Sequence, residues 1–221
     1  MGHSAEQNAR FVAKMEDVLS VYQCPHDPDR PVICMDEMSR QLLKHVREPT
    51  EAKPGTPRRH HHYERNGTVN LFTFFEPLAN HRVVLTRDRR TKVDWAECVR
   101  EVLDTCYSSA QKVVLVMDNL NTHGLSSLYD AFRPTEARRL AERLEIHYTP
   151  EHGSWLNMAE IERSVLARQA LSRRIPDREA IKQRTTAWQK QRNAADATVD
   201  WQFTSEEARI KLKRLYPKIE D

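Results

Sequence analysis

The most restrictive feature of this sequence is a run of five apolar residues, Val113–Met117, which is followed directly by Asp118. A short uninterrupted apolar run is typical of a strand buried on both faces, in the middle of a sheet covered by helices. A second segment of this kind, residues 31–36, also finishes in an acid, Asp36. Because the reactive groups of open α/β sheets gather where strands end, the pattern predicts two carboxylates at one sheet edge.

The composition indicates an ordinary soluble globular protein, since 39% of the 221 residues are hydrophobic and 30% are charged. This length is sufficient for one domain with its own core and some appendages. No apolar run approaches the length of a membrane span, and the N-terminus lacks the apolar segment of a secretory signal. The four cysteines form no CxxC pair, which favours reduced core thiols in a cytosolic protein.

The spacing of apolar residues predicts an alternation of strands and helices along the chain. The predicted strands cover residues 31–36, 68–75, 82–86, 113–117 and 146–148. The predicted helices cover residues 6–23, 92–106, 134–144, 157–171 and 177–192, with a short helix after Thr204 or Ser205, and residues 37–62 are expected to be irregular. This order predicts an α/β fold of the RNase H-like type, a mixed five-stranded sheet flanked by helices.

We expect three parts in the chain. Residues 1–30 form an N-terminal helix and connector, residues 31–171 an RNase H-like catalytic domain, and residues 172–221 a helical basic extension. The last part contains twelve Lys and Arg residues against eight Asp and Glu residues. Basic flanks beside an acidic centre suit an enzyme that binds phosphates and holds a metal ion.

Three acids are candidates for a metal site, and they are Asp36, Asp118 and Glu160, the last in the first turn of a predicted helix. Clustered carboxylates repel each other unless cations bind between them. Their hard oxygen atoms suit Mg²⁺ or Mn²⁺. Two such ions roughly 3.5–4 Å apart can activate an attacking oxygen and stabilise the leaving oxygen at a phosphorus centre.

Simpler interpretations exist for each of these acids. An Asp at the end of a strand often only forms a turn or caps a helix. Asn157 and Glu160 have the spacing of a capping box, in which the glutamate side chain bonds back to the backbone of the first residue. Glu37 is either a spare ligand or, as we expect, an acid on a solvent-facing loop.

Two longer motifs support the metal site. Asp118 and Asn119 are followed by His123, and Trp155-Leu-Asn157 leads into Glu160. With these motifs the chain resembles the catalytic domain of bacterial insertion-sequence transposases of the mariner-like DDE superfamily. The resemblance implies that Asp36, Asp118 and Glu160 are catalytic and hold two Mg²⁺ or Mn²⁺ ions. It also implies water-driven cleavage at transposon ends, followed by attack of the freed 3′-hydroxyl on target DNA.

The same resemblance gives auxiliary roles to Asn119, His123, Trp155 and Asn157. Asn119 and His123 either orient the substrate or a metal-bound water, or they cap a turn and pack at a helix start. Trp155 either stacks on a base or anchors its loop in the core.

Several arginines are expected to contact the phosphate backbone of DNA. They are Arg58, Arg59, Arg65, Arg173 and Arg174. Arg58 and Arg59 lie on the long polar segment, which is otherwise a solvated loop. The adjacent His60–His62 do not have the spacing of metal ligands on a strand or helix.

The family normally carries helix-turn-helix modules ahead of its catalytic domain, but only 35 residues precede Asp36. We therefore expect a separately encoded helix-turn-helix subunit, or a truncated copy, together with a homodimer on DNA in the bacterial cytoplasm at the nucleoid. Membrane partners are not expected. Two alternatives remain: a nuclease that cuts without joining, and an idle remnant that binds DNA or a transposase.

Overall fold

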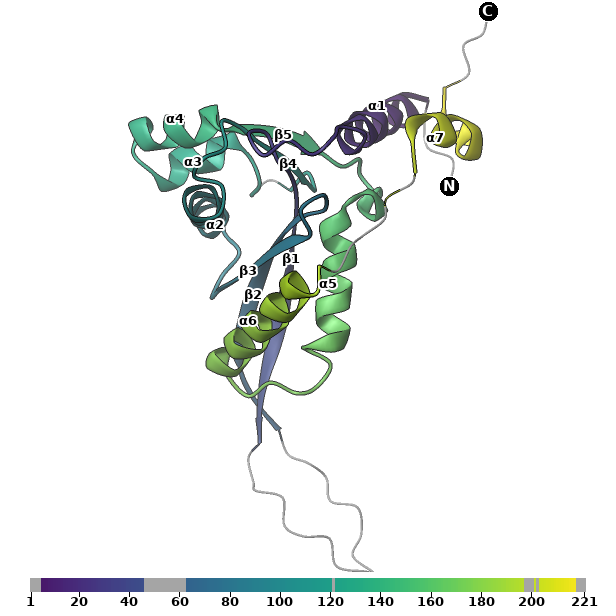
Figure 1. Ribbon diagram of the computed structural model, residues 1–221. Helices are drawn as coiled ribbons and strands as arrows, with labels where there is room; N and C mark the ends of the chain where they lie inside the picture. Colours follow the sequence, from purple (N-terminus) through teal and green to yellow (C-terminus); the bar gives the residue numbers. More distant parts are fainter. Residues whose placement is uncertain (1–4, 46–62, 121, 197–200, 202, 218–221) are drawn as a thin grey trace, which may run out of the picture.

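The computed structural model describes residues 5–45, 63–120, 122–196, 201 and 203–217 (Figure 1). The strands are β1 (Val32–His45), β2 (Tyr63–Glu76), β3 (His81–Arg87), β4 (Val113–Met117) and β5 (Leu144–Tyr148). The α-helices are α1 (Ala5–Tyr22), α2 (Lys92–Thr105), α3 (Leu125–Ala131), α4 (Pro134–Glu142), α5 (Met158–Gln169), α6 (Arg178–Ala194) and α7 (Ser205–Lys211). Two 3₁₀ turns, η1 (Ser154–Leu156) and η2 (Lys213–Leu215), complete the described elements.

The strands form one mixed sheet in the order β3-β2-β1-β4-β5. β1 and β2 pair antiparallel, as do β2 and β3, whereas β1 and β4, and β4 and β5, pair parallel. The predicted α/β class and the mixed five-stranded sheet are therefore confirmed. The parallel β1–β4 pair is central, which agrees with the all-apolar sequence of β4.

Helices cover both faces of the sheet (Figure 1). Along β1 the side chains alternate, so Ile33 and Met35 lie in one apolar cluster with α2, α3 and α4. Cys34 lies in a second cluster that also contains residues of α1, α5 and α7. A third cluster joins the outer part of β1 and β2 to α5 and α6. The division of the chain into residues 1–30, 31–171 and 172–221 stays a prediction.

β1 continues well past Asp36, which corrects the prediction that the strand ends there and that residues 37–45 are irregular. The parallel pairing with β4 covers only Val32–Cys34, but the antiparallel pairing with β2 continues to His45. Among the described residues, α5 and α6 pack on one face of this extension, which agrees with its lack of a continuous apolar run. Asp36 therefore lies where β4 separates from β1.

Local signals predicted several helix starts well. Thr91 caps α2 in a capping box with Asp94, and Thr204 caps α7 in a capping box with Glu207. The short helix α3 was not predicted, because seven residues carry too little periodicity.

Two helix ends differ from the prediction. Leu144 begins β5 instead of ending a helix, since α4 stops at Glu142. The predicted helix 92–106 ends one residue earlier, at Thr105.

The cysteines differ in burial. Cys34 and Cys98 are buried, whereas Cys106, which follows α2, is exposed. No described helix combines the length and the apolar character that crossing a bilayer requires.

Candidate active site

The two aspartates predicted from the strand pattern lie beside each other where β1 and β4 separate. Asp118 directly follows the last residue of β4. Asp36 is mostly buried, with 14% of its side chain exposed. Burial raises the pKa of the Asp36 carboxyl to about 6, Arg163 and the Glu37 amide oppose this, and the charges of Asp118 and Glu160 raise it further. The structure thus brings the three acids within electrostatic reach of one another.

Asn157 connects the third acid to the first. It caps α5, since its side-chain oxygen accepts a hydrogen bond from the Ala159 amide at 3.0 Å. Its side-chain nitrogen donates to the backbone oxygen of Met35 at 2.8 Å, across 122 residues of sequence. The helix that carries Glu160 is therefore held against β1 one residue before Asp36. The Glu160 side chain contacts Arg163, and the proposed capping box with Asn157 does not form.

We expect Asn157→Ala to destabilise the fold by about 2–4 kcal/mol, because it removes a helix cap and leaves a buried carbonyl without its donor. We also expect Mn²⁺-dependent DNA nicking to fall about 10–100-fold, as when a group that positions metal ligands is lost. Asn157→Asp separates the two roles, because it keeps the oxygen that caps α5 but cannot donate to Met35. Urea unfolding and a nicking assay measure both effects; wild-type values for both variants would exclude the positioning role.

Arg163, which the sequence analysis missed, lies between two of the acids. Its Nε atom is 2.5 Å from Asp36 Oδ2, and its Nη2 atom is 3.3 Å from Glu160 Oε1. Neither Asp36 Oδ2 nor Arg163 Nε has a partner with hydrogen-bond geometry, so their contact is an ion pair defined by distance alone. The spacing of three residues from Glu160 on α5 was the available signal.

His123 forms a hydrogen bond with Asp118. Its ring is buried and stacks on Trp95, with the centroids 6.0 Å apart. Nδ1 is 2.8 Å from Asp118 Oδ1, and Nε2 is 3.3 Å from Glu37 Oε2. Burial lowers the pKa of His123, but the hydrogen bonds to the two carboxylates outweigh it and raise the pKa to about 9. His123 therefore both packs in the core and orients a candidate ligand.

Glu37 is not the solvent-facing loop acid that we expected. It lies within β1, and only 5% of its side chain is exposed. Arg90 Nη1 lies 3.4 Å from Glu37 Oε1, the carboxylate oxygen that His123 does not contact. Because β1 continues beyond Asp36, Glu37 is buried, and its carboxylate contacts His123 on the ring nitrogen that does not contact Asp118.

The remaining candidates lie further out. Asn119 is exposed. Trp155 is 42% exposed and meets Phe203 edge-on, so the interpretation as a core anchor is wrong. Arg65 is exposed on β2, and Arg173 and Arg174 are exposed after the end of α5. Arg58, Arg59 and His60–His62 lie outside the described residues.

The acids suit a divalent cation by their chemistry. Among the described residues, no three His, Cys, Asp or Glu side chains are already arranged as a metal-ligand set. However, all three donors are hard carboxylates, and Asp36 Oδ2 is a buried oxygen without a hydrogen-bond donor. The Arg163 guanidinium places a positive charge beside Asp36 and Glu160. A divalent cation and Arg163 would compete for the same carboxylates.

Comparisons with known proteins identify a family and a shared fold. The family model described as DDE superfamily endonuclease matches residues 31–182. The Mos1 strand transfer complex has a similar fold, with a TM-score of 0.60 and 11% identity, over 100% of this chain and 64% of that chain. The Mos1 paired-end complex with left transposon end matches with a TM-score of 0.58 and 12% identity, over 98% of this chain and 63% of that chain.

The Mos1 mariner paired-end complex with Mn matches with a TM-score of 0.56 and 13% identity, over 98% of this chain and 63% of that chain. The chain thus spans less than two thirds of the length of the Mos1 chain in each of these three structures. No curated protein matches the sequence.

Proposed function

Because the chain belongs to the DDE superfamily of endonucleases, we propose that residues 31–171 form the catalytic domain of a mariner-like DNA transposase. The proposed reaction is metal-dependent cleavage at transposon ends and strand transfer into target DNA. The observation that supports it most is that Asp36 lies where β4 leaves β1 and that the charges of Asp118 and Glu160 both raise the pKa of its carboxyl. The resemblance to complexes of a transposase supports it as well.

In this proposal Asp36, Asp118 and Glu160 hold two Mg²⁺ or Mn²⁺ ions, which would stabilise the attacking and leaving oxygens at phosphorus. His123 keeps the Asp118 carboxylate in one orientation. Asn157 holds the start of α5, which carries Glu160, against β1 at the residue before Asp36. Arg163, once it leaves the acids, is a cation available for a phosphate oxygen.

The chemistry proceeds by two phosphoryl transfers. In the first, water forms a bond to phosphorus at the transposon end, and the bond to the 3′-oxygen breaks, which frees a 3′-hydroxyl. In the second, this hydroxyl loses its proton and attacks a phosphodiester of the target, whose own 3′-oxygen leaves. One phosphorus–oxygen bond forms and one breaks in each step, so no protein–DNA bond is needed.

The proposal includes DNA as the partner, contacted by Arg58, Arg59, Arg65, Arg173 and Arg174. It also includes a homodimer on paired ends and a separate helix-turn-helix subunit for end recognition, in the bacterial cytoplasm at the nucleoid. The basic composition of residues 172–221 supports contact with a polyanion.

A strand-transfer assay with pre-cleaved transposon ends tests the proposal. We expect the full chain to join these ends to a plasmid in Mn²⁺ and not in EDTA, since the acids have no catalytic cation without metal. Nicking without joining would favour the simple nuclease. Retention of DNA with neither reaction would favour the idle remnant and exclude the transposase.

A further inference from the structure

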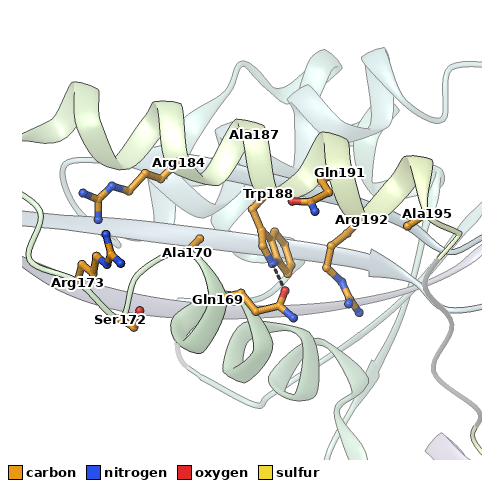
Figure 2. Close-up of a pocket in the computed structure, with 10 residues that line it drawn as sticks. All are labelled: Gln169, Ala170, Ser172, Arg173, Arg184, Ala187, Trp188, Gln191, Arg192 and Ala195. Atoms are coloured by element: carbon orange, nitrogen blue, oxygen red, sulfur yellow. Dashed lines mark hydrogen bonds between the residues drawn. The ribbon is translucent and has the colours of Figure 1, made fainter.

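A second possible binding site lies between the end of α5 and the length of α6 (Figure 2). This groove has a volume of about 810 Å³. Its lining contains three arginines, Arg173, Arg184 and Arg192, and no Asp or Glu. The α5–α6 groove is thus a strongly basic surface on a protein whose net charge is only +3.

Two of the arginines face each other without a counter-charge. Figure 2 shows the guanidinium groups of Arg173 and Arg184 turned toward one another across the groove. Among the described residues neither forms an ion pair, whereas Arg192 donates to the buried Glu162 at 3.0 Å. Two like charges held in this way repel each other, and an anion placed between them removes the repulsion.

The other polar groups of the groove also favour a ligand made of acceptors. The oxygen of Gln169 accepts a hydrogen bond from Trp188 Nε1 at 2.8 Å, which leaves the amide nitrogen of Gln169 as a donor. Guanidinium groups only donate. Phosphate oxygens only accept, and they fit the planar fork of arginine well. The chemistry of the groove therefore points to a phosphodiester.

The groove is separate from the catalytic centre. Gln169 lies nine residues after Glu160 on α5. At 1.5 Å and 100° per residue this is about 14 Å along the helix axis and about half a turn around it. A phosphate in the groove would therefore belong to a segment of DNA other than the one that reacts at the acids.

We propose that the α5–α6 groove binds the phosphate backbone of double-stranded DNA through Arg173 and Arg184, as a second DNA contact of this chain. The inference depends on the proposed function for the identity of the polymer. A duplex is favoured over a single strand because Trp188 is 5% exposed, so the groove offers no aromatic surface on which a base could stack.

Fluorescence anisotropy with a labelled duplex of arbitrary sequence, in EDTA, tests this site without any catalytic step. We expect Arg173→Ala/Arg184→Ala to weaken duplex binding by the full chain about 10-fold or more. The slope of log affinity against log salt should also decrease by about 2, because two phosphate contacts are lost. Arg184→Glu should weaken binding further, since its carboxylate would occupy Arg173.

Lys92→Ala/Arg138→Ala is the matched control, because it removes the same charge from exposed residues of α2 and α4 on the other face of the sheet. Wild-type affinity in this control, with a loss in the groove variant, supports the site. Unchanged duplex affinity in the groove variant, an equal loss in the control, or a loss confined to single strands would overturn it. Failed strand transfer with intact groove-dependent binding would refute the proposed reaction only.

Discussion

Replacement of Glu162 by alanine is expected to lower the free energy of unfolding by about 3–5 kcal/mol. Glu162 and Arg82 are both fully buried, and Arg82 Nε lies 2.8 Å from Glu162 Oε2. A second hydrogen bond joins Arg82 Nη2 to Glu162 Oε1 at 3.2 Å. Without the carboxylate, the Arg82 charge would stay in the core after losing the acid it is paired with, which costs far more than the loss of an exposed ion pair.

The position of this ion pair explains why the effect should extend to the whole fold. Arg82 lies on β3, Glu162 on α5 and Arg192 on α6, and Arg192 Nη2 donates to Glu162 Oε1 at 3.0 Å. Asn193, also on α6, bonds the backbone nitrogen and oxygen of Arg82 at 3.0 Å each. Glu162 therefore links its own helix, α5, both to β3 of the sheet and to α6.

Urea unfolding followed by circular dichroism measures this effect. Glu160→Ala is the control, because it changes the same residue type on the same helix at an ion pair whose side chains are 30% and 32% exposed, where about 0–1 kcal/mol is expected. The double variant Arg82→Met/Glu162→Met should recover much of the loss, since well-packed apolar side chains often replace a buried ion pair without cost. If Glu162→Ala were as stable as the wild type, the ion pair between Arg82 and Glu162 would not contribute to the free energy of unfolding.

Replacement of Asp118 by asparagine is expected to reduce Mn²⁺-dependent DNA nicking more than about 100-fold, which exceeds the usual effect of losing a group that only supports metal ligands. The asparagine keeps the shape of the side chain and an oxygen that can accept from His123, which also retains its contact with Glu37, so the protein should still fold. The negative charge is lost, and with it one carboxylate for the cation pair.

The assay compares nicking rates of supercoiled plasmid over a series of Mn²⁺ concentrations. Asp88→Asn serves as the control, because Asp88 is 71% exposed and pairs with Arg178 away from the acids. We expect the control to nick at the wild-type rate. Equal rates for the wild type and Asp118→Asn would remove the proposed site from the reaction.

Much of the fold could be predicted from short-range patterns. The apolar run before Asp118 placed the buried strand β4, and hydroxyl residues followed by acids placed the starts of α2 and α7. Such signals depend on residues two to four positions apart, where strand alternation, helical periodicity and capping operate. Where a segment is covered on one face only, as in the outer half of β1, the pattern was too weak to predict the strand.

The candidate site followed a different rule. The residue types of the three acids, and their positions near the ends of elements, were visible in the order of residues, because carboxylates beside buried strands form a local pattern. The tether from Asn157 to Met35, the ion pair of Arg163 with Asp36, and the burial of Glu162 against Arg82 were visible only after folding. These contacts join residues 80 or more positions apart, and their geometry depends on how α5 docks on the sheet. Local propensities carry no information about that docking, because packing of distant apolar faces decides it.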